Sequence, residues 1–329
     1  MMNFDQSMRI GELSFSRRDI VLEDQADVLA LHNRVFGADA TPAWFRWKYG
    51  NGGAEATGLW DERGRLVALC GGTPRTLLHE GKTVAAIQLG DVMVAPEVRG
   101  LLTRRGPFFQ VSRHFYESRI GSGRPYRIGF GFASQRHVRL AVALRLAWNE
   151  GTLQSLQWSD LAGKLPWGWR CTPLEPEHLE QAATEAWQLM QEGLTGLSAG
   201  CRDADYLRHR FLDRPEYVYH LYRIQRIWSR RTFGILVLRI QGELAHWLDW
   251  IGPPEAIGLA ARIAQTRAAA AGARTMTLWA SAAVCESLGI CSPEESTVAW
   301  VGIPCASTLL EEDGIRRKWW WMGGDTDFL

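Results

Sequence analysis

The sequence predicts a mixed α/β (α+β) fold made of two similar units, each a mostly antiparallel mixed sheet flanked by helices. Three observations support this. Two helix patterns precede three strand patterns, after which helices and strands alternate. A segment rich in Gly and Pro then follows at 161–175, and the same order restarts. Finally, residues 44–49 (WFRWKY) resemble residues 206–211 (YLRHRF) at the corresponding place in each half. Internal similarity of this kind indicates a duplicated unit.

Size and composition are those of an ordinary globular protein. The 329 residues, of which 46% are hydrophobic and 22% charged, exclude a disordered chain and suggest about two domains. The 16 Trp residues favour a large aromatic core. A formal net charge of +1 argues against a partner held by a strong overall field, such as nucleic acid or an anionic membrane.

The chain shows no signal for a membrane, a secretory pathway or a metal. It has no apolar span of transmembrane length, and its first residues lack the apolar region of a signal peptide. The six cysteines form no CxxC pair or His-flanked metal spacing. Dispersed free thiols are typical of a reducing cytoplasm, so we expect a cytoplasmic protein without a metal.

The elements of the first half follow from periodicity and turn residues. Residues 22–36 have helical apolar spacing that ends at Gly37, and Thr41-Pro42 provides an N-cap and first turn for a second helix ending at Gly50. Short Gly-containing turns separate the next three strands, which predicts an antiparallel meander. Residues 1–18 are polar and are expected to be loose or an edge strand. The further predicted elements are strands 56–61, 66–78, 83–94, 126–132 and 151–158 and helices 106–120 and 134–148.

The second half repeats this order. We assign 1–160 to an N-terminal domain, 161–175 to a linker and 176–329 to a C-terminal domain. The predicted helices are 177–194, 203–211, 254–271 and 282–288, and the predicted strands are 217–227, 232–240, 244–251, 275–280, 297–303 and 316–322.

The segment 87–109 (IQLGDVMVAPEVRGLLTRRGPFF) is the most informative. It predicts a strand, then a loop with two Gly and three Arg, then the start of a helix at Pro107. Backbone N–H groups at a helix N-terminus, the helix dipole and Arg side chains together favour a bound pyrophosphate. The alternative is a surface turn with solvated arginines.

Residues 91–100 (DVMVAPEVRG) and 129–135 (GFGFASQ), together with the element order, resemble the GNAT superfamily of acyl-CoA-dependent N-acyltransferases. The resemblance covers about 20–159. It implies that the fourth and fifth strands splay apart and that pantetheine pairs with backbone near Met93 and Val94. It also implies acetyl-CoA or another acyl-CoA as donor and direct attack by an amine. The residues expected at the phosphates are Arg99, Gly100, Thr103, Arg104, Arg105, Gly106 and Pro107.

The loop departs from the family pattern, because Leu-Leu-Thr-Arg-Arg separates Arg99-Gly100 from Gly106. Either the loop is several residues longer than usual, or Arg104, Arg105 and Gly106 alone play its part.

Asp91 is the first catalytic candidate. Strand alternation places it with Ile87, Leu89 and Met93. Apolar neighbours disfavour the charged form of a carboxylate, which suits a general base near neutral pH. The alternative is that Asp91 binds backbone N–H groups of the loop and only shapes it.

His137 is the second candidate. Helical spacing places it with Leu140, Ala141, Leu144 and Trp148, where a His could relay a proton or simply satisfy the helix start. Ser134 is expected to cap this helix rather than to act as an acid. The helix has no Tyr, although many family members place their general acid there.

Three further residues are candidates for the acceptor side. Trp44 and Trp47 either line a substrate pocket or belong to the core. Asp325, in the C-terminal stretch WWWMGGDTDFL, either holds an amine in a pocket between the halves or lies in a frayed tail. The second half has WIGPPE at the place of the Arg/Gly loop, and we therefore predict that it does not bind CoA.

The leading functional hypothesis is an N-acyltransferase, in the simplest case an N-acetyltransferase, that acts on a primary amine of a small molecule. One alternative is a non-catalytic acyl-CoA-sensing protein, suggested by the lengthened loop and the missing Tyr. Another is an aminoacyl-tRNA-dependent transferase, against which the near-neutral charge argues. The expected partner is a small-molecule amine, with no nucleic acid and no membrane, and the sequence leaves both a monomer and a homodimer open.

Overall fold

The computed structural model describes the chain except residues 1–5, 11–12, 101–103, 162, 291–295 and 309–317. The fold is a mixed α/β structure of mostly antiparallel sheet flanked by helices, which confirms the predicted class. It divides into two compact units. Unit 1 comprises Met1–Thr76, Val84–Glu150 and Trp300–Ile315, and unit 2 comprises Leu77–Thr83, Gly151–Ala299 and Arg316–Leu329.

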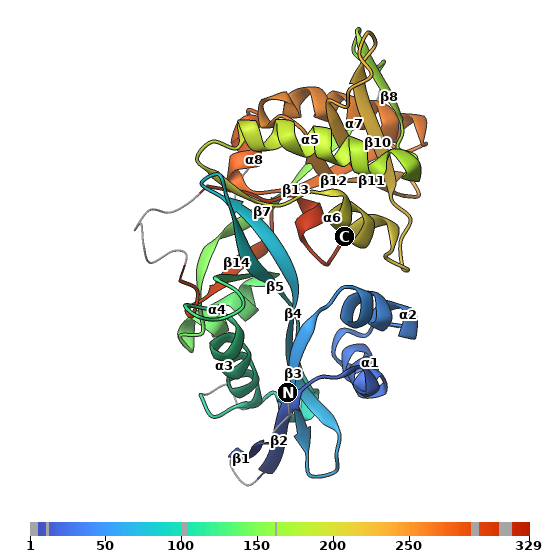
Figure 1. Cartoon of the computed structure of the whole chain (residues 1–329). Helices are drawn as coiled ribbons and strands as arrows, with labels where there is room; N and C mark the ends of the chain where they lie inside the picture. The colour runs from blue at the N-terminus through green and yellow to red at the C-terminus, as the bar shows by residue number, and fades with distance from the viewer. Residues whose placement is uncertain (1–5, 11–12, 101–103, 162, 291–295, 309–317) are drawn as a thin grey trace. The chain divides into compact units, whose positions relative to one another are not determined.

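Unit 1 is built on a sheet with the strand order β1-β2-β3-β4-β5-β6-β14. Helices α1 and α2 lie on one side of this sheet and α3 and α4 on the other (Figure 1). Pairing is antiparallel between β1, β2, β3 and β4, parallel between β5 and β6, and antiparallel between β6 and β14. The elements of unit 1 are β1 (Gln6–Ile10), β2 (Leu13–Asp19), η1 (Leu22–Asp24), α1 (Gln25–Phe36), α2 (Pro42–Phe45), η2 (Arg46–Asn51), β3 (Glu55–Asp61), β4 (Leu66–His79), β5 (Lys82–Val94), η3 (Pro96–Val98), α3 (Pro107–Arg119), β6 (Ile128–Ala133), α4 (Gln135–Ala143) and, from much later in the chain, β14 (Thr297–Pro304). Strand β7 (Ala147–Ser159) follows α4 along the chain.

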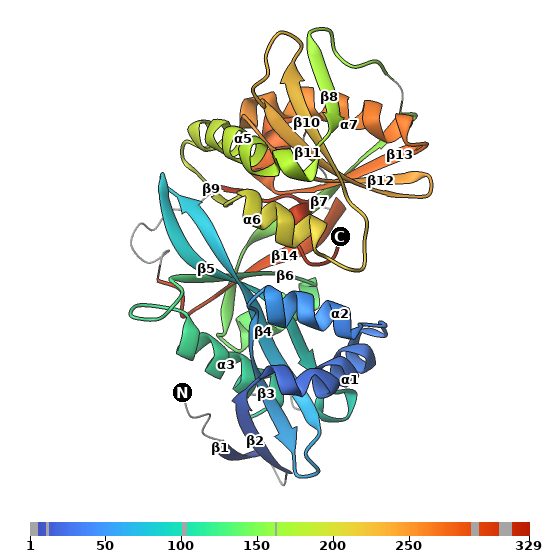
Figure 2. The same ribbon diagram turned by 45° about the vertical axis from the view of Figure 1, so that its right-hand side comes forward.

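Unit 2 has a sheet with the order β8-β10-β11-β12-β13-β7 (Figure 2). Helices α5 and α7 both pack on its central strands β11 and β12. Only β12 and β13 pair in parallel in this part of the sheet. The elements are β8 (Trp169–Pro173), η4 (Pro176–His178), α5 (Leu179–Gly193), β9 (Leu197–Gly200), α6 (Ala204–Leu207), η5 (Arg208–Leu212), β10 (His220–Arg226), β11 (Gly234–Gln241), β12 (Leu244–Ile251), η6 (Pro254–Ala256), α7 (Ile257–Ala270), β13 (Thr275–Ala280), α8 (Ala282–Ser287), β15 (Lys318–Trp320) and η8 (Gly323–Asp325).

The two segments that resemble each other in sequence also fold alike. In unit 1 the Thr41 side chain accepts the N–H of Trp44, and one α-helical turn passes into the wider π-helical turn η2. In unit 2 Asp203 accepts the N–H of Tyr206, and α6 passes into the π-helical turn η5 in the same way. A side-chain cap satisfies an N–H group that the helix itself leaves without a partner. The shared sequence pattern therefore encodes a shared turn.

The last strand of each sheet comes from the other half of the chain. In unit 1, Trp300–Gly302 of β14 pair with β6. In unit 2, Gln154–Ser159 of β7 pair with β13. The predicted domain ranges 1–160 and 176–329 would place these two strands in the opposite units, because sequence order alone does not reveal which sheet a strand joins.

Three local predictions need correction. The helix predicted over 134–148 ends at Ala143, since Arg145 adopts a left-handed conformation (φ 59°) and Leu146 N–H bonds back to Ala141 in a Schellman-type end. Trp148 consequently lies on β7 and not on the helix face of His137. The segment 161–175, predicted to be a linker, contains strand β8 (Trp169–Pro173). Strand β9 (Leu197–Gly200) lies where no strand was predicted.

Each unit has its own apolar core. The core of unit 2 includes fully buried Trp247, Trp250 and Trp320, and that of unit 1 includes Trp44 and Phe45. None of the described helices is long and apolar enough to cross a membrane.

The fold predicts a local steric limit where β5 and β6 pair. A Cβ on Gly131 would lie 3.0 Å from the Leu89 Cβ and 3.1 Å from its carbonyl oxygen, whereas a Cβ on Gly302, its partner in β14, would meet its nearest atom at 3.8 Å. Gly131→Ala should therefore lower the free energy of unfolding by about 1–3 kcal/mol, as overpacking typically does. Gly302→Ala is the matched control and should change it by less than about 1 kcal/mol. Denaturant unfolding of the full chain measures both, and equal effects would contradict this packing.

Candidate functional site

The centre of the candidate site is the point where β5 and β6 stop pairing. The two strands pair in parallel from Ala86 opposite Ile128 to Leu89 opposite Gly131. Beyond Leu89 and Gly131 these two strands form no further pair, although β5 continues to Val94 and β6 to Ala133. The predicted divergence of the fourth and fifth strands is thus present in unit 1.

Asp91 lies two residues past the last paired residue of β5. Its backbone is left-handed (φ 51°), which is uncommon for a residue with a side chain but is tolerated best by Asp and Asn. The Lys48 Nζ lies 2.9 Å from Asp91 Oδ2, and the Tyr49 hydroxyl donates a 2.8 Å hydrogen bond to the same oxygen. Both partners come from the π-helical turn η2.

The second oxygen of Asp91, Oδ1, receives no hydrogen bond from the described residues. The Asp91 side chain is 9% exposed and that of Lys48 is 5% exposed. A carboxylate can accept about four hydrogen bonds. The geometry therefore fixes one oxygen of Asp91 and leaves its other oxygen as an acceptor.

The predicted environment of Asp91 was wrong in one respect. Strand alternation suggested apolar neighbours, but the carboxylate faces a buried ammonium group and a hydroxyl. The left-handed backbone at Asp91 interrupts the regular alternation on which that prediction relied. The alternative was that Asp91 binds backbone N–H groups of the loop. Among the described residues, no loop N–H donates a hydrogen bond to Asp91.

Trp44 and Trp47 lie in the core of unit 1, with exposed fractions of 4% and 7%. Trp44 packs against His32 at a ring distance of 4.5 Å and lies 5.5 Å from the Lys48 Nζ. These contacts correspond to the core interpretation of the two Trp residues. The Trp44 ring also lies edge-on to the Tyr49 ring at a centroid distance of 6.2 Å, so it packs against both turn residues that contact Asp91.

The predicted phosphate-binding residues frame the N-terminus of α3. Gly106 occupies the N-cap position without a side-chain cap, and Pro107 is the first helical residue. Arg104 and Arg105 are exposed, and Gln110 Nε2 donates to the Arg104 carbonyl at 2.7 Å. Gly100 is exposed at the other end of the loop, where an added Cβ would meet no atom within 4 Å. Thr103 lies outside the described residues.

The backbone positions predicted for pantetheine differ in accessibility. The Met93 side chain is fully buried in the core of unit 1. The Val94 carbonyl accepts a 2.8 Å hydrogen bond from Arg99 Nε. This bond orients the exposed Arg99 side chain at the end of β5, next to the loop.

His137 lies near the loop end of the site. Its ring packs edge-on against Phe108, in the first turn of α3, at a centroid distance of 5.2 Å. Burial lowers the pKa of His137, so its ring is neutral at pH 7. Ser134 caps α4 by accepting the His137 N–H, as predicted.

Unit 2 has an aspartate at the corresponding place. β12 and β13 pair in parallel up to Trp247 opposite Leu278, and Asp249 lies two residues beyond. Pro and Glu follow each aspartate at the same spacing, at Pro96-Glu97 and Pro254-Glu255, and each pair opens a 3-10 turn.

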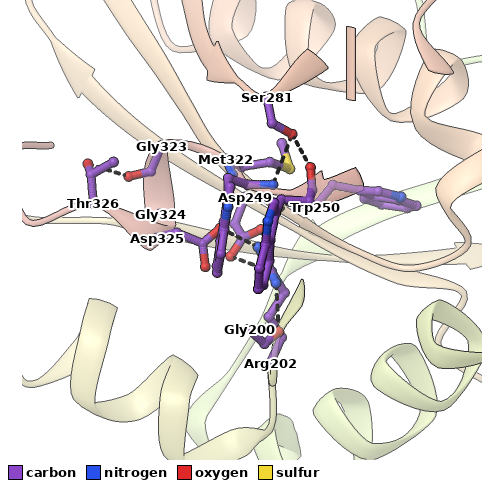
Figure 3. Close-up of polar contacts among 12 residues, drawn as sticks. Gly200, Arg202, Asp249, Trp250, Ser281, Met322, Gly323, Gly324, Asp325 and Thr326 are labelled. Atoms are coloured by element: carbon purple, nitrogen blue, oxygen red, sulfur yellow. Dashed lines mark hydrogen bonds and ion pairs between the residues drawn. The ribbon is translucent and has the colours of Figure 1, made fainter. Parts of the chain in front are cut away.

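Asp249 differs from Asp91 because both of its oxygens are occupied (Figure 3). Arg202 Nε lies 2.9 Å from Oδ1 and 3.1 Å from Oδ2, the Trp250 N–H donates to Oδ1, and the Tyr206 hydroxyl donates to Oδ2. The side chains of Arg202 and Asp249 are both 0% exposed. Burial lowers the pKa of Arg202, but the charges of Asp249 and Asp325 outweigh it and raise that pKa above its usual range.

Asp325 belongs to this buried cluster. It is 0% exposed, lies 2.6 Å from Arg202 Nη2, and accepts the Met322 N–H. The structure therefore shows Asp325 as the second partner of Arg202 within unit 2. The prediction that Asp325 holds an amine would need a carboxylate oxygen that a substrate can reach, and the Asp325 side chain is fully buried.

The segment 319–325 fills the divergence of β12 and β13. Met322 bridges to Ala280 at the end of β13, and the Ser281 hydroxyl donates to the Trp319 carbonyl at 2.6 Å. A Cβ on Gly324 would meet Asp249 Oδ2 and the Leu248 carbonyl at 3.1 Å. The chain itself thus occupies the place in unit 2 that lies beside Asp91 in unit 1.

Comparison with known proteins identifies the family of unit 1. Residues 17–137 match the model of the GNAT acetyltransferase domain. The chain therefore contains a GNAT-superfamily acyltransferase domain. No curated protein sequence matches the chain.

Solved structures extend the GNAT fold beyond the matched domain. A probable N-acyltransferase of Enterococcus faecalis is 11% identical with a TM-score of 0.63, covering 90% of this chain and 73% of its own. A GCN5-related N-acetyltransferase of Kribbella flavida is 16% identical with a TM-score of 0.61, covering 90% and 72%. An N-myristoyltransferase of Saccharomyces cerevisiae, solved with myristoyl-CoA, is 13% identical with a TM-score of 0.56, covering 92% and 84%.

Sequence reasoning missed Lys48, Tyr49, Arg202 and Asp249. A signal for Lys48, Tyr49 and Asp249 was present, because the matching segments 44–49 and 206–211 and the two Asp-x4-Pro-Glu patterns mark the same places in each half, whereas Arg202 lies outside these patterns. What the sequence could not reveal was that, within each unit, the segment contacts the aspartate of that same unit. Among the described residues, no cluster of His, Cys, Asp or Glu could hold a metal ion.

The Lys48–Asp91 pair yields a stability prediction. Asp91→Ala removes the carboxylate that lies 2.9 Å from the buried Lys48 ammonium and should lower the free energy of unfolding by about 3–5 kcal/mol. Lys48→Met combined with Asp91→Ala should cost clearly less than the sum of the single changes, because the two changes remove both members of one buried ion pair. Chemical denaturation of the four proteins in the double-mutant cycle measures this coupling. Additive single effects would show that the pair is not coupled.

Proposed function

We propose that the protein is an N-acyltransferase that moves an acyl group from acyl-CoA to a primary amine of a small molecule. The observation that carries the proposal is the Asp91 carboxylate at the divergence of β5 and β6, with Oδ2 held by Lys48 and Tyr49 and Oδ1 able to accept from an ammonium group. The GNAT domain match over 17–137 gives the class of reaction.

The residues at the start of α3 fit the pyrophosphate of a CoA donor. The first N–H groups of the 13-residue helix α3 have no side-chain cap at Gly106. Arg99, Arg104 and Arg105 add exposed cations around this end. Helix N-terminus and guanidinium groups are the combination that binds phosphates best.

The proposed reaction is a direct transfer. Asp91 Oδ1 accepts a proton from the ammonium group, and the amine nitrogen then attacks the thioester carbonyl. The new C–N bond forms as the C–S bond breaks, the nitrogen loses its remaining extra proton, and the thiolate leaves and takes up a proton. His137, neutral at pH 7 and beside the loop, is the proposed relay for these protons.

We infer that each chain has one such site, and that unit 2 is a second version of the same unit that has lost it. Two features support this inference. Asp249 has no oxygen left to accept a proton, and the segment 319–325 fills the divergence beside it. Acetyl-CoA is the simplest donor under this proposal, and the cytoplasm is the expected location of the protein.

Loss of the proposed base should reduce turnover and spare donor binding. Asp91→Asn keeps the shape and the tolerance of a left-handed backbone but removes the charge, so kcat should fall by about 10²–10⁴-fold. The KM for acyl-CoA should change by less than about threefold, because Asp91 is not among the residues proposed to bind the phosphates. Thiol release with an amine panel measures both constants. Asp205→Asn, on the exposed surface of α6, is the matched control, and an unchanged kcat in Asp91→Asn would rule out the base assignment.

Calorimetric titration with CoA should give one binding site per chain. Replacing Arg99, Arg104 and Arg105 by Ala should weaken this binding at least tenfold, since each Arg supplies a charge-assisted bond worth about 1.5–3 kcal/mol when made. Arg113→Ala is the control, because Arg113 lies on the same helix and pairs with Glu117 at the surface. Two sites per chain, or unchanged affinity in the triple variant, would overturn the assignment.

A further inference from the structure

The ends of β8 and β10 form an exposed tip of unit 2 that the proposed reaction does not use. The two strands run side by side, and both views show them extending together at one end of the unit (Figures 1 and 2). The tip comprises the segments 163–170 and 226–231. The Ile227 N–H donates to the Gly168 carbonyl at 3.0 Å, which ties the two segments together.

The tip exposes aromatic surface that a protein core would normally bury. Trp167 is 86% exposed and Trp228 is 65% exposed, and their ring centroids lie 6.0 Å apart. Ile227 adds an aliphatic side chain that is 45% exposed. Gly168 allows this arrangement, because a Cβ there would lie 3.2 Å from the Trp228 ring.

The charges at the tip are all of one sign. The exposed charged residues of the two segments are Lys164, Arg170, Arg226, Arg230 and Arg231, and residues 161–174 and 217–242 contain no Asp or Glu. Arg226 stacks 3.9 Å above the Trp169 ring and lies 5.8 Å from the Trp228 ring. In the described part of the chain no acidic side chain forms an ion pair with these five cations.

Neighbouring elements do not neutralise this charge. On the α5 side, the acidic Glu185 accepts the Thr232 N–H and lies 3.8 Å from Arg223. Arg223 lies outside the two tip segments, so this ion pair does not involve a cation of the tip. On the α7 side, Arg267 donates to the Cys171 carbonyl, and Arg262 is exposed. The tip is therefore locally cationic although the whole chain has a formal net charge of only +1.

We propose that this tip docks the protein on an anionic lipid surface. Trp side chains concentrate at the membrane interface, where an amphipathic ring suits the boundary between headgroups and acyl chains. Lys and Arg near an anionic surface each strengthen binding by about fivefold. Exposed Trp and Ile side chains, with five exposed cations in the same two segments, combine both features on one small projection.

The geometry favours a lipid surface over single-stranded nucleic acid. Bases stack on parallel aromatic faces, but the planes of Trp167 and Trp228 are tilted by 55°. An aliphatic Ile227 side chain inserts among acyl chains but offers no face to a base. The whole-chain charge, which predicted no membrane contact, averages over surfaces that never meet a membrane together.

Co-sedimentation of the full chain with vesicles tests the proposal. The protein should bind vesicles of phosphatidylcholine with 30% phosphatidylserine, should bind pure phosphatidylcholine at least tenfold more weakly, and should dissociate as salt rises. Trp167→Ala with Trp228→Ala should weaken binding at least tenfold. Arg230→Gln with Arg231→Gln should weaken it by about 10- to 30-fold, because two cations are lost.

The controls are Arg63→Gln with Arg124→Gln, which removes two exposed cations of unit 1, and Leu22→Ala, which removes an exposed apolar side chain. These should bind as the parent protein does, and circular dichroism confirms that all variants are folded. Absence of vesicle binding, or binding that the tip variants leave unchanged, overturns the proposal. Tighter binding of a single-stranded oligonucleotide, with the same dependence on the tip residues, overturns it in favour of a nucleic-acid partner.

Discussion

The ion pair between Lys48 and Asp91 is the interaction on which the account of unit 1 depends. A buried ammonium group is costly unless a counter-charge meets it, and the turn η2 brings Lys48 to within 2.9 Å of the carboxylate. The pair fixes Asp91 at the point where β5 leaves β6. The same contact therefore does two things. It pairs a buried charge, which stability requires, and it places an acceptor oxygen where the two strands diverge.

Unit 2 meets the same requirement in a different way. Its aspartate, Asp249, pairs with a buried arginine, and the guanidinium reaches Asp325 as well. Arg has five N–H donors in a fixed planar arrangement, so it can satisfy two carboxylates and the Gly200 carbonyl together. A single ammonium group on one oxygen leaves an acceptor, whereas the arginine network leaves none. The contrast between the two aspartates explains why we propose chemistry in only one unit.

Much of the fold could be predicted from the sequence, because local signals set most of its elements. Gly37, Thr41 and Pro42 placed the first two helices correctly, and the Gly-containing turns placed the meander. The end of α4 escaped prediction, because an Arg takes the left-handed position that usually signals itself by a Gly. The exchange of β7 and β14 escaped as well, since strand partners far apart in sequence leave no local pattern.

The site was predictable in its parts but not in its contacts. Asp91 and the residues from Arg99 to Pro107 stood out by type and spacing. The partners of Asp91 did not, because Lys48 and Tyr49 belong to an aromatic segment that suggests a core, which it also forms. The 16 Trp residues likewise belong to two structural classes that composition alone cannot separate. Residues such as Trp247 and Trp320 are fully buried, whereas Trp167 and Trp228 are exposed at the tip of unit 2.

The most direct test of the central claim is a crystal structure of the protein with an acyl-CoA and an amine product. We predict that the CoA sulfur and the amide nitrogen lie beside Asp91 Oδ1 in unit 1, with the pyrophosphate at the start of α3 and with segment 319–325 unmoved in unit 2. A thioester bound beside Asp249, or a CoA that meets neither aspartate, would contradict it.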